Sequence, residues 1–173
     1  MNTHAESQRL FFALWPDDET RNAIARIVKQ VAPLHQGKSI RTDNLHLTLA
    51  FLGHVNKAQR DCVERVAESI SITPFSLCLE HLGVFPRAKV LWLGIKEQPE
   101  ALIQLANKLA NGARNCEIKL DEKAFKPHVS LIRKVNRLSE LEIEPIYWSV
   151  NQFCLVHSTS HDGEVGYRVV KSW

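Results

Sequence analysis

The stretch Leu45-His46-Leu47-Thr48-Leu49-Ala50-Phe51-Leu52 contains two interleaved sets of side chains. Its odd-numbered residues are large and apolar, whereas His46, Thr48 and Ala50 occupy positions between them. Because side chains alternate between the two faces of an extended chain, this pattern predicts a β-strand with one buried face, ending at Gly53. On the other face an imidazole and a hydroxyl lie side by side, about 6 to 7 Å apart along the strand.

A second segment, Lys126-Pro127-His128-Val129-Ser130-Leu131-Ile132, repeats this pattern. His128 and Ser130 share one face, and apolar residues alternate with them. A histidine followed two positions later by Ser or Thr is a weak signal alone, and His157-Ser158-Thr159 is a third example that lacks the apolar neighbours. Each motif alone also fits a half-buried strand whose polar face is hydrogen-bonded, so a catalytic role is inferred only from the two motifs together.

The segments before the two histidines also resemble each other. Residues 9–15 are apolar and aromatic and precede a helix-start sequence at 16–19, so a strand followed by a helix is predicted. Residues 90–95 predict a second buried strand, followed by a helix that opens at Pro99 and ends before Gly112. Two strand–helix units, each leading to a histidine strand, indicate an internal duplication.

Further elements complete the predicted fold. Asn56 is expected to cap another helix, and strands are expected at residues 75–82, 148–157 and 165–170. The last two would form a terminal hairpin around a turn at His161-Asp162-Gly163. Since no linker or low-complexity stretch divides the chain, residues 1–173 are predicted to form a single domain.

Composition limits the classes of protein to which the chain can belong. Its 173 residues are 45% hydrophobic and 24% charged, which is typical of one globular domain and excludes a disordered chain or a coiled coil. Lys and Arg number 22 against 19 Asp and Glu, a net charge of +3 that permits an RNA partner without requiring one. No apolar run reaches the ~18 residues of a membrane span and no export signal is present, so a cytoplasmic protein is expected.

The cysteines are far apart in the sequence and form no C-x-x-C pair; they are Cys62, Cys78, Cys116 and Cys154. This spacing fits neither a zinc site nor a dense disulfide framework. All four are therefore expected to be reduced and to pack as small apolar side chains.

Two histidines and two hydroxyls on facing strands would form a four-cornered site. The unperturbed pKa of an imidazole is about 6.5, so near neutral pH one copy can accept a proton while the other donates one. This suits catalysis at phosphorus: one imidazole deprotonates the attacking water or hydroxyl, the other protonates the leaving sugar oxygen, and the hydroxyls bind the non-bridging oxygens. Zinc is the rival partner of histidine, but it needs three or four ligands and neither motif carries another at a suitable spacing, so no metal is predicted.

Paired motifs of this kind, bracketed by two strand–helix units, resemble those of the two-histidine phosphoesterase superfamily. Within it, the sequence is similar to the bacterial and archaeal RNA 2′,3′-cyclic phosphodiesterase family, historically called 2′-5′ RNA ligases. The similar strings are residues 9–14, 43–53, 90–94 and 125–131, so the resemblance covers nearly the whole chain.

The resemblance implies a bilobal, pseudo-two-fold α+β fold, in which two antiparallel sheets face a central cleft and helices cover the outer faces. It implies hydrolysis of a terminal 2′,3′-cyclic phosphate on RNA, with tRNA fragments among the candidate substrates, to leave a 2′-phosphate without a metal or nucleotide cofactor. His46 and His128 match the catalytic pair, and Thr48 and Ser130 match the phosphate-binding hydroxyls. From the family picture we assign His46 as acid and His128 as base, although the sequence itself does not distinguish them. A monomer is expected.

Two neighbouring side chains are further candidates for substrate binding. Arg133 matches a basic position of the family and could neutralise the phosphate, or it could be an exposed cation at a strand end. Phe125 could stack on the terminal base, or it could belong to the core. Several cations in segments expected near the cleft could follow the RNA backbone: Lys38, Arg41, Arg87, Lys89, Lys123, Lys126 and Lys134.

Two other functions remain open. The same site working in reverse would join a 5′-hydroxyl RNA end to the cyclic phosphate without ATP, although water at about 55 M favours hydrolysis. Alternatively, the chain could be a nucleotide-binding module without turnover. The presence of both histidines and both hydroxyls argues against this, because phosphate binding alone is better served by Arg and backbone amides.

Overall fold

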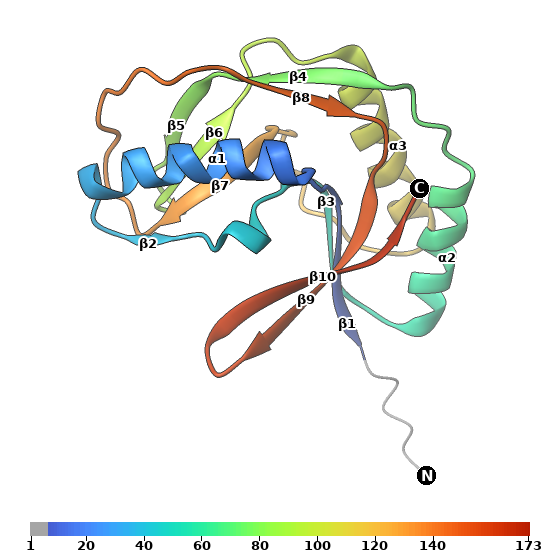
Figure 1. Ribbon diagram of the computed structural model, residues 1–173. Helices are drawn as coiled ribbons and strands as arrows, with labels where there is room; N and C mark the ends of the chain where they lie inside the picture. The colour runs from blue at the N-terminus through green and yellow to red at the C-terminus, as the bar shows by residue number, and fades with distance from the viewer. Residues whose placement is uncertain (1–6) are drawn as a thin grey trace.

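A large antiparallel sheet runs through the computed structural model, which describes residues 7–173 (Figure 1). Its strand order is β10-β9-β1-β3-β7-β6-β5, and β2 also pairs with β7. The strands are β1 (Gln8–Leu14), β2 (Lys38–Ser39), β3 (Leu47–Val55), β5 (His81–Phe85), β6 (Val90–Gly94), β7 (His128–Arg133), β9 (Cys154–His161) and β10 (Glu164–Ser172). A separate two-stranded sheet consists of β4 (Phe75–Leu79) and β8 (Ile146–Val150).

Strands β3 and β7 meet in the middle of the large sheet through one residue pair, Leu47 opposite Val129. On one side of this join β1 pairs with β3 and β9, and on the other side β6 pairs with β5 and β7. The α+β architecture with antiparallel sheets is therefore confirmed. The Leu47–Val129 pair makes the two histidine segments parts of one continuous sheet, while the internal two-fold relation of the halves stays a prediction.

The first two helices begin where the sequence provides side-chain caps. The helices are α1 (Asp18–Val31), α2 (Lys57–Glu68) and α3 (Glu100–Asn115), with 3-10 turns η1 (Ala32–Leu34) and η2 (Thr42–Asn44) between α1 and β3. The Asp17 side chain accepts a hydrogen bond of 2.7 Å from the amide of Thr20, and Asn56 forms a capping box with Gln59. The predicted cap at Asn56 is thus confirmed. Within residues 7–173 no helix is long and apolar enough to cross a membrane.

The helices cover one face of the sheet. The apolar stripe of α1 is buried in the large core, while α2 and α3 lie side by side and α3 contacts β3 (Figure 1). Phe12 and Leu14 of β1 belong to this core, so Phe11 and Ala13 point to the opposite face. There they form a smaller cluster drawn from strands alone: Phe11, Ala13, Cys154 and Val156. This strand-lined face is the one that carries the candidate site.

The terminal hairpin is confirmed, since β9 and β10 pair along their length on either side of Asp162 and Gly163. The predicted strands at 75–82 and 148–157 are each divided into two strands instead. The reason is topological: β4 and β8 belong to the small sheet, and the chain then crosses to the large sheet to form β5 and β9.

Two predicted element boundaries are wrong, because Gly53 does not end its strand and Gly112 does not end its helix. Strand β3 passes through Gly53 to Val55, since glycine tolerates the φ of +71° found there. Helix α3 continues through Gly112 to Asn115, and a side chain at Gly112 would collide with Val66 of α2. Gly112 therefore permits close contact between two helices.

The prediction that all four cysteines are reduced is wrong for two of them. Cys62 on α2 and Cys116 at the end of α3 form a disulfide, with their Cα atoms 5.8 Å apart. Their separation of 54 residues hid the pairing, which arises because α2 and α3 pack against each other. Cys78 and Cys154 are free, and Cys154 is buried as expected.

Candidate active site

The two candidate catalytic histidines lie at the entrances of the two central strands. His46 precedes the first residue of β3, and His128 is the first residue of β7. The Leu47–Val129 pair therefore holds the two motifs next to each other. Burial is the main cause of the lowered pKa of His46, and the charges of His128 and Arg133 lower it further.

Both imidazoles are oriented in the same way by the backbone. Nδ1 of His46 lies 2.6 Å from the carbonyl oxygen of Asn44, and Nδ1 of His128 lies 2.6 Å from that of Lys126. A carbonyl oxygen can only accept a hydrogen bond, so Nδ1 carries the proton in each ring. Each Nε2 is then left to accept or donate the proton that a reaction requires.

The hydroxyls occupy the positions that the alternation predicts. Oγ1 of Thr48 lies 3.1 Å from Nε2 of His46, and it donates to that nitrogen when the imidazole is neutral. Ser130 follows His128 by two positions on β7 and lies opposite Trp92 of β6. Both hydroxyl residues are half-buried, so they line the site without being sealed from it.

Burial sets the protonation of the two imidazoles. It lowers the pKa of His46 to about 4, an effect that the Asn44 carbonyl partly opposes and that the charges of His128 and Arg133 reinforce. Burial also lowers the pKa of His128, against the opposing effect of the Lys126 carbonyl. Without a bound anion both rings are therefore neutral at pH 7.

A β-bulge brings Arg133 to the catalytic face. Trp92 lies opposite Ser130 and Leu91 lies opposite Ile132, so Leu131 is the extra residue on β7. The bulge interrupts strict alternation: Leu131 and Ile132 are both buried, and Arg133 then follows Ser130 onto the exposed side. The predicted position of Arg133 near the cleft agrees with its electrostatic effect on His46.

Three aromatic rings enclose His46. Trp15 stacks on the imidazole at a centroid distance of 5.4 Å and an angle of 10°, while Phe11 and Tyr167 lie at 4.9 and 5.0 Å. These contacts were not predicted from the sequence, since Phe11 is one of several apolar residues in its strand. Tyr167 reaches the site through the register of the terminal hairpin, which the local pattern does not specify.

His128 has its own aromatic neighbours. Phe85 meets its ring edge-on at 4.8 Å, and Trp92 lies at 6.2 Å. The Trp92 indole lies across Gly83 and Gly94, where a side chain on either glycine would collide with it. The glycines thus allow a large ring to lie flat on the strands beside the catalytic pair.

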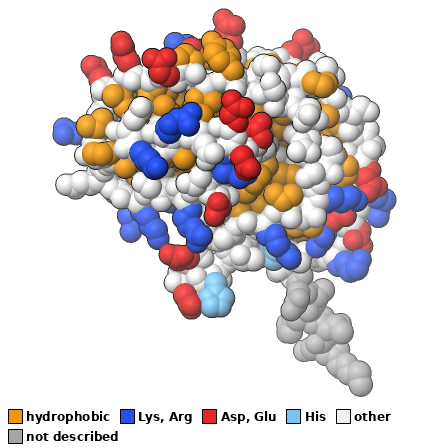
Figure 2. All heavy atoms as spheres, in the orientation of Figure 1, with side chains coloured by type: hydrophobic (Ala, Val, Ile, Leu, Met, Phe, Trp, Pro, Cys, Tyr) orange, Lys and Arg blue, Asp and Glu red, His pale blue; other side chains and the backbone are white. Residues whose placement is uncertain are grey.

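The remaining candidates are placed less centrally. Phe125 is half-buried and packs against the large core, so its proposed stacking on a base stays a prediction. Of the expected cations, Lys38 lies opposite Arg133 in the sheet, whereas Arg41 and Lys123 are ion-paired with carboxylates. Figure 2 shows Lys and Arg distributed over the displayed face with Asp and Glu among them, rather than one continuous basic patch.

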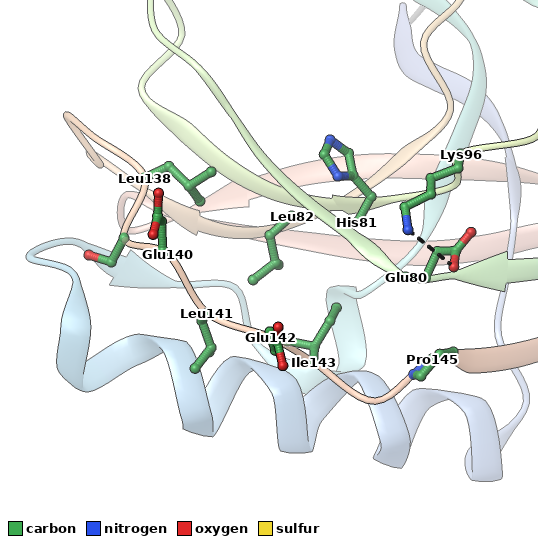
Figure 3. Close-up of a pocket in the computed structure, with 11 residues that line it drawn as sticks. Glu80, His81, Leu82, Lys96, Leu138, Glu140, Leu141, Glu142, Ile143 and Pro145 are labelled. Carbon is green, nitrogen blue, oxygen red and sulfur yellow. Dashed lines mark ion pairs between the residues drawn. The ribbon is translucent and has the colours of Figure 1, made fainter.

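A separate pocket of about 600 Å³ lies between β5 and the segment before β8 (Figure 3). Its lining includes Leu82, Leu141 and the ion pair of Glu80 with Lys96, at 3.6 Å. Neither catalytic histidine lines it. Among residues 7–173, no group of three or more His, Cys, Asp or Glu side chains is arranged to hold a metal ion.

Paired histidine motifs on adjoining strands define the class of this protein, and the comparisons agree. The chain belongs to the 2′-5′ RNA ligase superfamily, whose family model matches residues 16–162. The RNA 2′,3′-cyclic phosphodiesterase of Escherichia coli (strain K12) is 34% identical over 171 residues, covering 98% of this chain and 97% of that relative. The enzyme of the same name from Archaeoglobus fulgidus is 33% identical over 128 residues, 72% of each chain. The crystal structure of E. coli LigT complexed with 3′-AMP superposes with a TM-score of 0.88 at 34% identity, covering 97% of this chain and 98% of that one.

Proposed function

We propose that this protein is an RNA 2′,3′-cyclic phosphodiesterase, which opens a terminal 2′,3′-cyclic phosphate to leave a 2′-phosphate. The observation that carries the proposal is the matched orientation of His46 and His128, each with Nδ1 bonded to a backbone carbonyl and Nε2 on the side of the ring away from that carbonyl, where it can transfer a proton. The near full-length relative named RNA 2′,3′-cyclic phosphodiesterase supports the reaction, and the LigT complex with 3′-AMP supports a nucleotide ligand.

In this reaction a water oxygen attacks phosphorus and the bond from phosphorus to the 3′ oxygen breaks. Nε2 of His128 takes the proton from the water, and the protonated Nε2 of His46 gives one to the 3′ oxygen. Thr48, Ser130 and Arg133 hold the non-bridging oxygens, whose negative charge grows in the transition state. Proton exchange with solvent then restores both imidazoles.

The acid role requires His46 to be protonated, although burial lowers its pKa to about 4. A bound phosphodiester places a negative charge beside the ring, and an adjacent opposite charge favours the imidazolium. Substrate binding therefore raises the pKa of His46 and supplies the proton where it is used.

The finer assignments belong to the same proposal. The substrate is RNA with a 2′,3′-cyclic phosphate end, and tRNA fragments are candidates among the RNAs cleaved by attack of a 2′-hydroxyl on the adjacent phosphodiester, which leaves such an end. A monomeric cytoplasmic enzyme fits this role. Disulfides are rare in reducing compartments, so the bond between Cys62 and Cys116 makes fractionation of cells the test of location.

The proposal is tested by incubating the purified protein, with EDTA present, with a short RNA that ends in a 2′,3′-cyclic phosphate. We expect a 2′-phosphate product, and we expect His46→Ala and His128→Ala each to lower turnover by about 10²- to 10⁴-fold. His161→Ala is the matched control, because His161 lies exposed at the tip of the terminal hairpin.

Three other outcomes of this experiment would each support a different alternative. Ligated product in the presence of a 5′-hydroxyl RNA would assign the reverse reaction to the site. Tight binding of the RNA without turnover in the wild type would overturn the proposal in favour of a binding module. Full activity in a folded His46→Ala or His128→Ala protein would remove that histidine from the mechanism.

A further inference from the structure

The carbonyl groups that orient the two imidazoles occupy the same position in each motif. Nδ1 of His46 lies 2.6 Å from the carbonyl oxygen of Asn44, and Nδ1 of His128 lies 2.6 Å from that of Lys126, in each case two positions before the ring. Each ring is therefore held only as firmly as the peptide group that carries its carbonyl.

In the second motif a proline restrains this carbonyl. Pro127 is buried and stands between Lys126 and His128. A proline excludes the helical conformation of the residue before it, because its Cδ clashes with the backbone of that residue. The carbonyl of Lys126 thus has a limited range of directions, although the Lys126 side chain itself is exposed.

The first motif lacks this restraint, since Leu45 stands where the second motif has Pro127. Asn44 is the last residue of η2, a 3-10 turn of three residues, and its amide donates to the carbonyl of Arg41 at 2.9 Å. Hydrogen bonds in a 3-10 turn have poorer geometry than those of an α-helix. The backbone alone therefore holds the carbonyl of Asn44 less firmly than Pro127 holds that of Lys126.

The side chain of Asn44 provides a long-range restraint instead. Its Nδ2 donates a hydrogen bond of 2.9 Å to the carbonyl oxygen of Val165 on β10, 121 residues further along the chain. The same strand reaches the imidazole through Tyr167, whose ring meets that of His46 edge-on at a centroid distance of 5.0 Å. The terminal hairpin thus contacts both the catalytic ring and the residue that orients it.

We propose that Asn44 is a positioning residue for His46, and that its side-chain bond to β10 holds the carbonyl that fixes the imidazole for proton transfer. This inference rests on the proposed function and goes beyond it, because Asn44 acts through His46 and contacts no reacting atom itself. Without the side-chain bond the carbonyl can turn, so Nε2 of His46 spends less time in the productive orientation. The substrate does not contact Asn44, so the effect falls on kcat and not on KM.

A nearby ion pair provides a matched control. Arg41 and Glu164 connect the same turn to the same hairpin at 3.5 Å, and both side chains are 63% exposed. Exposed ion pairs contribute little to stability, because water and salt screen them. Glu164→Gln therefore removes a contact between hairpin and turn while the bond from Asn44 to Val165 remains.

The test compares the wild type with Asn44→Ala, Asn44→Asp and Glu164→Gln. Asn44→Asp keeps the size of the side chain, but at pH 7.5 its carboxylate has no hydrogen to donate to the Val165 carbonyl. Imidazole ¹⁵N chemical shifts of the free proteins report which nitrogen of His46 and of His128 carries the proton. Steady-state kcat and KM are measured on a short RNA that ends in a 2′,3′-cyclic phosphate.

In the wild type and in Glu164→Gln we expect only the form of His46 with the proton on Nδ1. Both Asn44 variants should add a measurable population with the proton on Nε2, while His128 stays unchanged. Their kcat should fall by about 3- to 10-fold, the effect of one hydrogen bond, with KM within about 2-fold of the wild type.

Three results would overturn the inference: unchanged ¹⁵N shifts of His46 in both Asn44 variants, a change in KM in place of kcat, or an equal fall of kcat in Glu164→Gln. Absence of turnover in the wild type would instead contradict the proposed function. The ¹⁵N shifts would still decide whether Asn44 positions His46, so the two failures are distinguishable.

Discussion

The two histidine motifs are nearly alike in sequence, but their surroundings differ. His46 is enclosed by Trp15, Phe11 and Tyr167, and burial lowers its pKa to about 4. His128 has Phe85 and the more distant Trp92 beside it, and its pKa is lowered as well. The backbone carbonyl fixes the same tautomer in both rings, whereas the packing around each ring determines how readily it takes up a second proton.

This difference affects which histidine acts as the general acid and which as the general base. A histidine with a strongly lowered pKa is neutral before substrate binds, which suits a base. The resemblance to the family instead makes His46 the acid. The two views agree only if the substrate anion restores the proton affinity of His46.

Replacing the 3′ oxygen of the cyclic phosphate by sulfur should separate the two histidines. A thiolate leaves without help from an acid, so this substrate should recover at least about 100-fold of the rate lost in His46→Ala and little of that lost in His128→Ala. Single-turnover rates on oxygen and sulfur substrates provide the measurement. The opposite pattern of recovery would exchange the two roles.

Arg133→Met should lower kcat/KM by about 10- to 100-fold, because it removes a charged donor to the phosphate while keeping an unbranched side chain of similar length. It should also raise the pKa of His46, since the charge of Arg133 contributes to its lowering. Lys134→Met removes the adjacent exposed cation and is the control. Equal losses in both variants would show that Arg133 acts only through the general surface charge and not through a specific contact with the phosphate.

Titration of the imidazole protons by NMR tests the comparison directly. In the free protein His46 should titrate near pH 4, and His128 should also titrate below the unperturbed value of about 6.5. Inorganic phosphate should raise both pKa values, because the bound anion stabilises the imidazolium. If phosphate binds and leaves the pKa of His46 unchanged, the proposed supply of the acid proton is wrong.

The same shift predicts how stability depends on pH. Because the pKa of His46 is lowered by folding, the unfolded chain binds more protons between about pH 4 and pH 6.5. The contribution of the buried neutral ring is therefore complete above pH 6.5 and is lost as the pH falls toward 4. His46→Gln should show a smaller decrease in the free energy of unfolding over this range than the wild type, as measured by urea denaturation at each pH.

Much of the site could be predicted from sequence because its signals are local. His46, Thr48, His128 and Ser130 share a face through the two-residue period of a strand, and the cap at Asn56 depends on residues three positions apart. What the sequence did not reveal depends on contacts between distant segments. The rings around His46 come from β1 and β10, and Arg133 reaches the catalytic face because of a bulge that strict alternation does not anticipate.

The disulfide offers a comparison between the catalytic face and the helical face. Cys62 and Cys116 join α2, which follows the first histidine strand, to α3, which precedes the second, so the bond ties the two halves together on the side away from the open face. Cys62→Ser should lower the free energy of unfolding by about 2 to 4 kcal/mol, because the unfolded chain loses a 54-residue cross-link. Turnover should stay unchanged, since the single pair of Leu47 with Val129 still holds the histidine strands together. Cys78→Ser, which removes a free thiol, is the control. A large fall in kcat in the folded Cys62→Ser protein would show that the helical face, and not the strand pair alone, sets the distance between the two imidazoles.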